Sequence, residues 1–323
     1  MTTSPARLYV ILAREAPVGV IFRRGPSRWV QVIHWDTATD TFTPGQWLHA
    51  RLHERRSDIS PNGKLMIYFA VQENRITPKR EEFIYSWTAI SKPPYLTALA
   101  LWPLGQSWGG GGMFLENDEV WLNHPPACLT PHEKHKPQGL TLTHVESTIG
   151  EEEQVYQRLE RNGWRRIQDW QGEYIKSNRD KANDERIYAG ITFSSEWYWN
   201  LPQEDFPSHY VDHAPGIHER PNLDQTATLV MKKTRGGGDA IPYGFAFSIR
   251  DNHGQELQIE KAEWADWDQQ GRLVYARDGK LFEFTLAGDS IELADFNDAT
   301  PEQMVAPEWA KTWDGSKKEE DRP

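Results

Sequence analysis

The stretch "DWDQQGRLVYARDGKLFEF" (Asp266–Phe284) contains two strand patterns joined by a tight turn. A polar turn ending in Gly271 leads into the alternating run Arg272–Gly279, and Asp278-Gly279 separates this run from the next, Lys280–Ala287. An Asp-Gly pair between two alternating runs is a strong short-range signal of a hairpin with a type I′ turn. The stretch therefore predicts an antiparallel hairpin.

The same design occurs near the start of the chain, in "DISPNGKLMIYFA" (Asp58–Ala70). Here too a polar turn is followed by glycine, a basic residue, leucine and an alternating strand. A third stretch, "WDTATDTFTPGQWL" (Trp35–Leu48), has the pattern of a turn between a middle and an outer strand. Self-similarity of this kind indicates an internal repeat, so we expect several sheets built to one plan.

These stretches carry a resemblance to a known class of repeat. The turn "SPNGK" (Ser60–Lys64) resembles the SPDGK turn of TolB-like and other WD40-like β-propeller repeats, and "WDTATDT" is similar to their W-D-x-x-T strand end. The Gly-His pair that opens a full WD40 repeat is absent. The resemblance implies a divergent β-propeller of no specific subfamily. At roughly 40 to 50 residues per blade, the chain would hold about five or six four-stranded blades with one or two helical insertions.

Strand-like runs recur along the rest of the chain, rich in aromatic and β-branched residues and bounded by Gly, Pro, Asn or Asp. They are Arg7–Ala13, Val18–Arg24, Trp29–Trp35, Lys64–Val71, Glu82–Ile90, Leu96–Trp102, Arg186–Phe193, Ala227–Lys233 and Gly244–Asp251. This rhythm predicts an all-β fold. A pair of β-sandwich domains is the alternative to the propeller.

Two segments have helical patterns. Glu151–Trp164 opens with carboxylates and closes at Asn162-Gly163, as helix ends prefer. Thr300–Trp313 offers an N-cap threonine before a proline, although Pro307 would interrupt the helix. We therefore expect one propeller-like domain over residues 1–299 with a helical insertion near 150–163. Residues 300–323 would form a C-terminal helix and a disordered tail.

Two further segments, Asn123–Gln138 and Trp199–Thr226, are rich in proline and histidine and lack periodicity. We expect long loops there, and loops of this length are often functional.

Composition limits the classes of partner. The chain has 36 Lys and Arg against 47 Asp and Glu, a formal charge of −11, which argues against nucleic-acid binding and against docking on anionic membranes. The basic clusters Arg51–Arg56 and Arg161–Arg166 are expected to be solvated element ends. The single cysteine, Cys128, fits a reducing compartment. Because Leu8–Ala13 is too short for a signal-peptide core, we expect a cytoplasmic protein.

The glycine run in "WGGGGMFLENDEVWLN" (Trp108–Asn123) raises the question of phosphate binding. A phosphate cradle needs a glycine-rich loop that leads into a helix. Here Met113–Leu115 and Val120–Leu122 have strand patterns around an Asn-Asp turn. The run therefore predicts a corner between strands, where glycine tolerates a positive φ, and the loop beside Trp108 could meet a partner.

A metal site is a weaker alternative. His209, Asp212, His213 and His218 lie within ten residues of one another, and imidazole with carboxylate would hold zinc or iron. The spacing is not that of a helical His-Glu-x-x-His motif, so a polar loop is the simpler interpretation. No Gly-x-Ser-x-Gly motif is present, and nothing places a base beside Cys128.

The first hypothesis is a cytoplasmic, non-enzymatic propeller scaffold that binds a protein partner without a cofactor. The expected contacts on its rim are Trp108, Gly109, Gly110, Gly111, Gly112, Trp197 and Trp199. The alternatives are a propeller hydrolase or lyase, assisted by zinc or iron at His209, Asp212 and His213, and a carbohydrate-binding propeller that uses Trp197 and Trp199.

Overall fold

A computed structural model describes residues 4–72, 85–144, 146–169, 171–175, 209–234 and 244–314. The chain divides into two compact units. The first comprises residues 1–164, 222–225 and 261–323, and the second comprises residues 165–221 and 226–260. None of the helices in the described ranges is long and apolar enough to cross a membrane.

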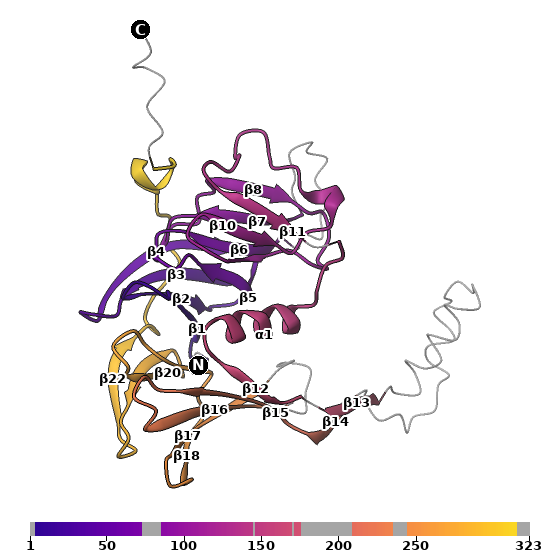
Figure 1. The fold of residues 1–323 in the computed structure, drawn as a ribbon. Coiled ribbons are helices and arrows are strands. Elements are labelled where there is room, and N and C mark those ends of the chain that lie inside the picture. Colours follow the sequence, from indigo (N-terminus) through magenta and orange to yellow (C-terminus); the bar gives the residue numbers. More distant parts are fainter. Residues whose placement is uncertain are drawn as a thin grey trace, which may run out of the picture. The chain divides into compact units, whose positions relative to one another are not determined.

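The first unit contains four sheets (Figure 1). The first sheet is β1 (Arg7–Leu12), β2 (Val18–Arg24), β3 (Trp29–Asp36) and β4 (Thr41–His49). The second is β5 (Arg51–Ile59), β6 (Met66–Val71), β7 (Ser86–Ser91) and β8 (Ala100–Pro103). The third is β9 (Gly112–Phe114), β10 (Glu119–Leu122) and β11 (Thr141–His144), and the last is β19 (Trp264–Trp267), β20 (Leu273–Arg277), β21 (Lys280–Phe284) and β22 (Ser290–Asp295). Strands pair antiparallel with their neighbours in chain order, except that β11 is parallel to β10.

The second unit is also built of strands. Its main sheet is ordered β12 (Arg165–Gln168), β15 (Gly216–Pro221), β16 (Ala227–Thr234), β17 (Gly244–Asp251) and β18 (Glu256–Ile259). A separate pair is formed by β13 (Gln171–Ile175) and β14 (His209–Ala214). The all-β class is thus confirmed, with several antiparallel four-stranded sheets.

Most strand predictions are confirmed. Val18–Arg24 and Gly244–Asp251 match β2 and β17 residue for residue. Leu96–Trp102 shortens to β8 because the backbone first pairs with β7 at Leu99, whose N–H donates to Ile90 O. The expected strand Arg186–Phe193 lies outside the described residues.

The repeated turn predicted from sequence has one backbone geometry. In Ser60–Gly63 and in Asp268–Gly271 the glycine N–H donates to the carbonyl three residues earlier, at 2.8 and 3.0 Å, and both glycines have positive φ. The turn Asn222–Gln225 has the same bond at 3.1 Å, with Gln225 at φ 57°. The same bond closes Asp251–Gly254 and Thr285–Gly288, at 3.1 and 2.9 Å, so this turn geometry recurs between later strands too and does not by itself mark a repeat.

The Asp278-Gly279 hairpin is confirmed as well. It joins β20 to β21, and both residues have positive φ, 51° and 74°, as a type I′ turn requires. Between β3 and β4, Asp36 caps the turn by accepting hydrogen bonds from the backbone N–H groups of Ala38 and Thr39.

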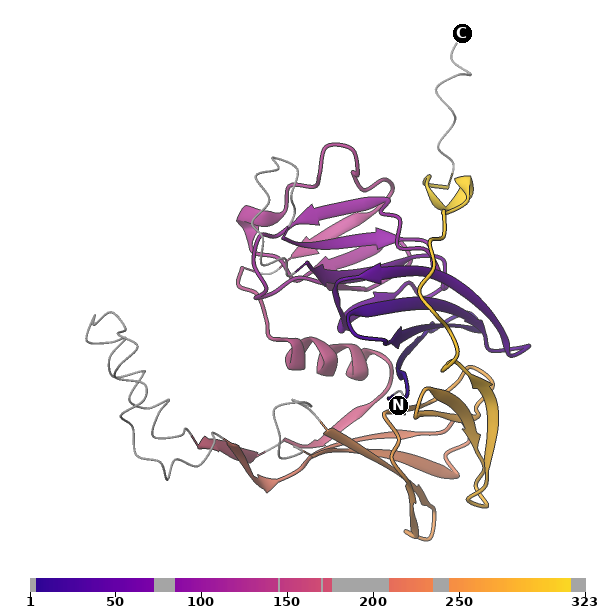
Figure 2. The same ribbon diagram turned by 180° about the vertical axis from the view of Figure 1, so that it is seen from behind.

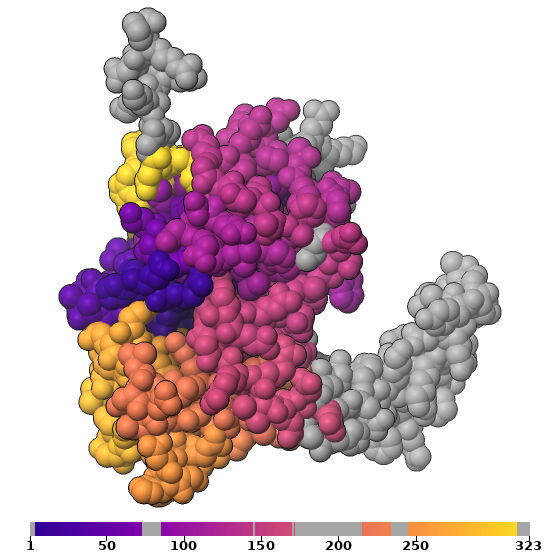
Figure 3. All heavy atoms as spheres, viewed as in Figure 1, coloured from indigo at the N-terminus to yellow at the C-terminus, as the bar shows by residue number. Residues whose placement is uncertain are grey.

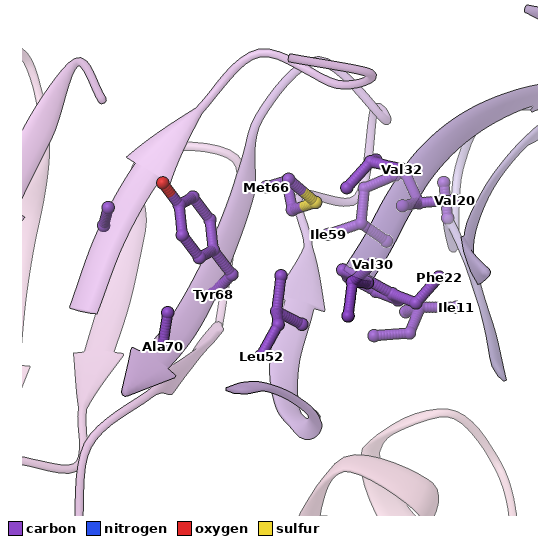
Figure 4. Close-up of a cluster of buried hydrophobic side chains, with 12 residues drawn as sticks. Ile11, Val20, Phe22, Val30, Val32, Leu52, Ile59, Met66, Tyr68 and Ala70 are labelled. Atoms are coloured by element: carbon purple, nitrogen blue, oxygen red, sulfur yellow. The ribbon is translucent and has the colours of Figure 1, made fainter. Parts of the chain in front are cut away.

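Apolar side chains bury the faces between sheets of the first unit. Figure 4 shows Val20 and Val32 of the first sheet facing Ile59 and Met66 of the second. A second cluster joins the first sheet to the last through fully buried Trp35, and a third joins the second sheet to β9 and β10. The four sheets therefore pack as a series in which the last strands of the chain contact the first.

The helix α1 (Glu151–Arg161) confirms that the segment predicted to be helical forms a helix. The expected C-terminal helix Thr300–Trp313 is wrong, because only the short 3-10 helix η2 (Glu308–Ala310) forms there. Pro307 has no N–H to donate and its backbone is extended, with ψ 161°. The segment instead runs past the first strands as an extended chain (Figure 2), and yellow spheres of the C-terminal part lie against purple ones in Figure 3. Ala306 and Ala310 are buried. Of the expected disordered tail, 314–323, the structure describes Asp314, and residues 315–323 lie outside the described residues.

Candidate functional site

The glycine run is a corner between strands, as predicted. Gly109, Gly110 and Gly111 have φ of 72°, 83° and 80°, and Gly112 begins β9 rather than a helix. β9 and β10 then pair antiparallel around the Asn117-Asp118 turn. The geometry is not that of a phosphate cradle, because no helix N-terminus follows the loop.

The corner requires glycine because other groups lie very close to it. A Cβ atom on Gly110 would lie 2.3 Å from the Phe69 ring, and one on Gly111 would lie 2.1 Å from Arg56 O. All four glycines are buried, whereas Trp108 has 77% of its surface exposed. The indole of Trp108 is therefore the part of this segment that another molecule can contact, and the four glycines are buried.

A buried hydrogen-bond chain fixes the corner from below. Gly111 N–H donates to Thr88 Oγ1 at 2.8 Å, and Thr88 Oγ1 lies 2.8 Å from His124 Nε2. His124 Nδ1 lies 3.0 Å from Cys128 O, and because a carbonyl only accepts, Nδ1 carries the proton and Nε2 accepts from the hydroxyl of Thr88. Burial lowers the pKa of His124, which keeps the ring neutral. Thr88 and His124 therefore have a structural role.

Arg56 binds the backbone carbonyls of the two residues on either side of Trp108. Its Nη1 donates to Ser107 O at 2.8 Å and also to Gly109 O. One guanidinium nitrogen thus fixes the backbone on both sides of the exposed indole. The arginine itself lies over the Phe69 ring, with 5.4 Å between its Cζ and the ring centroid.

Glu151, the first residue of α1, fixes Arg56 in turn. Its Oε2 lies 3.2 Å from Arg56 Nε and 3.1 Å from His53 Nδ1. Burial by itself would raise the pKa of the Glu151 carboxyl, but the hydrogen bond from His53 and the charge of Arg56 outweigh it and hold that pKa below its usual value. A charged network within the protein therefore supports the exposed Trp108.

Sequence reasoning missed this network. The Arg51–Arg56 cluster was expected to be solvated, yet the side chain of Arg56 has only 12% of its surface exposed. Arg56 lies about fifty positions from Ser107 and about a hundred from Glu151, and no local pattern joins positions so far apart. The one available signal was the unusual place of a tryptophan before four glycines.

The other predicted site residues fall in the second unit or outside the described ranges. Trp197 and Trp199 are outside them. His209, Asp212 and His213 belong to β14, and His218 belongs to β15, where its side chain is buried. The single long loop expected over Trp199–Thr226 is therefore wrong for residues 209–221, because pairing with β13 and β16 makes strands of them.

The metal prediction stays a prediction. Among the residues whose side chains the structure describes, no group of three or more His, Cys, Asp or Glu could hold a metal ion.

The chain has no match among protein-family models and none among curated proteins.

Proposed function

We propose that the chain is a non-enzymatic interaction module built on a β-propeller, which binds a protein partner through the Trp108 corner. The packing of the sheets supports the propeller. Each four-stranded sheet of the first unit has its strands in chain order, the sheets pack as a series, and the last contacts the first. Strands β15–β18 of the second unit also follow chain order.

The position of α1 supports an interaction role over chemistry in a central channel. Arg158 donates to Ser57 O of β5 and to the hydroxyl of Tyr9 on β1, and Gln154 donates to Gly112 O of β9. β5, β1 and β9 are each the first strand of their sheet. In a propeller, the blades surround a central channel, and the first strand of each blade lies beside it. In the proposed fold α1 fills the space where propeller hydrolases gather their catalytic groups.

Trp108 carries the proposal. Tryptophan is among the residues that dominate protein interfaces, and an anchor that is already rigid loses little entropy on binding. Trp108 combines 77% exposure with a backbone held on both sides by Arg56. The proposed partner is a cytoplasmic protein with an apolar pocket for the indole, and the net charge of −11 favours a partner that is not itself strongly acidic.

The test is affinity capture from native cytoplasm with tagged wild-type chain and Trp108→Ala, followed by titration of the captured partner. We expect Trp108→Ala to weaken binding by at least about thirtyfold, as for an interface hot spot, without a change in thermal unfolding. Leu286→Ala is the control, because Leu286 is also an exposed apolar residue, at 61%, and lies outside the proposed contact. Equal affinity of Trp108→Ala and wild type would refute the proposal.

Metal analysis of the same preparation separates the alternatives. About one zinc or iron per chain without a partner would favour a metal-assisted hydrolase that uses His209, Asp212 and His213. Loss of glycan binding in Trp197→Ala, with the fold retained, would favour the carbohydrate-binding propeller.

A further inference from the structure

A buried ammonium group lines two adjoining pockets in the first unit. The pockets have volumes of about 300 and 340 Å³ and share Asn62, Lys64, Lys92 and Asp314. Lys92 is only 6% exposed, and its Nζ lies 2.9 Å from Trp309 O and 2.5 Å from Asp314 Oδ1. A lysine is rarely buried to this extent unless a counter-charge compensates it.

Lys92 is buried, but the carboxylate that compensates its charge is exposed. The side chain of Asp314 is 77% exposed, so solvent screens the pair from one side only. The hydrogen bond from Lys92 lowers the pKa of Asp314, which keeps the carboxylate charged at neutral pH. If Asp314 moves away, the buried ammonium of Lys92 needs another anion in its place, because a buried charge left unpaired is costly.

The smaller pocket has the charges of an anion site. Lys64 and Lys92 line it together with the amide of Asn62, and Asp314 is the acidic residue among its described lining residues. Burial lowers the pKa of His34, which also lines this pocket, so its ring is neutral at pH 7. Asp118 lines the larger pocket instead. The smaller pocket thus has a net positive charge even with Asp314 in place.

We propose that this smaller pocket binds a compact oxyanion, a carboxylate or phosphate group, which replaces the Asp314 carboxylate on the ammonium of Lys92. Lys64 pairs with the second oxygen, the Asn62 amide donates to the ligand, and Trp309 covers its carbon skeleton. Asp314 then acts as an internal competitor. The site is separate from the Trp108 corner and does not depend on the proposed protein partner.

Titration calorimetry with inorganic phosphate and with acetate, at ionic strength held constant with sodium chloride, tests the proposal and distinguishes the two anion classes. We expect saturable binding of at least one anion. Lys64→Ala should raise the Kd about fivefold, because it removes one ion pair. Asp314→Asn should lower the Kd about fivefold, because it removes the competitor.

Lys280→Ala is the matched control, since Lys280 is a partly exposed lysine that pairs with Glu292 and Asp295 away from the pocket. The anion Kd of Lys280→Ala should equal that of the wild type. Three results would overturn the proposal: no saturable binding of either anion, an unchanged Kd in Asp314→Asn, or the same loss in Lys280→Ala as in Lys64→Ala.

Discussion

At the scale of single residues, the glycine corner depends on the absence of a side chain. Gly110 has φ of 83°, a conformation that costs other residues about 1 to 2 kcal/mol, and its α-carbon faces the Phe69 ring. Gly139 has a similar φ of 66°, but a Cβ there would have no neighbour within 4 Å. The two positions therefore separate backbone strain from steric overlap.

We predict that Gly110→Ala lowers the free energy of unfolding by about 3 kcal/mol or more, since strain and overlap with Phe69 add. Gly139→Ala should cost about 1 kcal/mol, from strain alone. Denaturant titration of both variants measures the difference. Equal losses would mean that the Phe69 ring moves aside easily, and the corner would then be softer than its contacts indicate.

At the scale of elements, charged side chains attach α1 to the strands. Arg161 binds both oxygens of Asp58 on β5, at 2.6 and 3.0 Å, and donates to Phe114 O of β9 at 2.7 Å. Asp58 is fully buried, and it also accepts from Phe114 N–H. Burial tends to lower the pKa of Arg161, but the charge of Asp58 outweighs it and raises that pKa.

We predict that Arg161→Met destabilises the protein by about 3 kcal/mol or more, because the Asp58 carboxylate remains buried without its counter-charge. Thermal and urea unfolding measure the loss. Lys311→Met, which breaks the exposed pair with Glu308, should cost less than about 0.5 kcal/mol. A loss near zero in Arg161→Met would show that α1 is held by its apolar contacts instead.

Elements differ in how well local sequence predicts them. Strands such as β2 and β17 follow from local sequence, because each is a short run of aromatic or β-branched residues bounded by turn residues. The C-terminal segment fails as a helix because its docking overrides its caps: Trp309 packs edge-on against Tyr95, and Lys92 binds Trp309 O. β14 and β15 were missed because their histidines and prolines are not typical of strands. Pairing with β13 and β16 makes them strands.

At the scale of the whole molecule, Arg272 ties the end of the first unit to its beginning. Nη1 and Nη2 lie 2.8 and 2.9 Å from the two oxygens of Asp40, Nε lies 2.8 Å from Asp268 Oδ2, and Nη2 donates to Thr37 O. Thr37 and Asp40 belong to the β3–β4 turn, whereas Asp268 precedes β20. The hydrogen bond from Arg272 holds the pKa of Asp40 below its usual value.

We predict that Arg272→Met costs about 3 kcal/mol at pH 7, because it strands the buried carboxylate of Asp268. A carboxyl group with a lowered folded pKa stabilises the protein above its unfolded pKa of about 3.9, and this contribution disappears as pH falls through the folded pKa. The difference in unfolding free energy between the wild type and Arg272→Met should therefore become smaller below about pH 4. Urea titrations from pH 7 to pH 2.5 check this, and a constant gap would contradict the role of Asp40.

The sequence by itself determined the all-β class, many of the strand positions, the helix α1 and the Asp278-Gly279 hairpin, because alternation, turn residues and helix ends act over a few neighbouring residues. Tertiary structure alone decided that the glycines lie buried under Trp108, that Arg56 and Glu151 support it, and that Lys92 lies in a pocket with Asp314. Those contacts join positions about fifty to two hundred residues apart. They depend on how sheets pack, which no local pattern records.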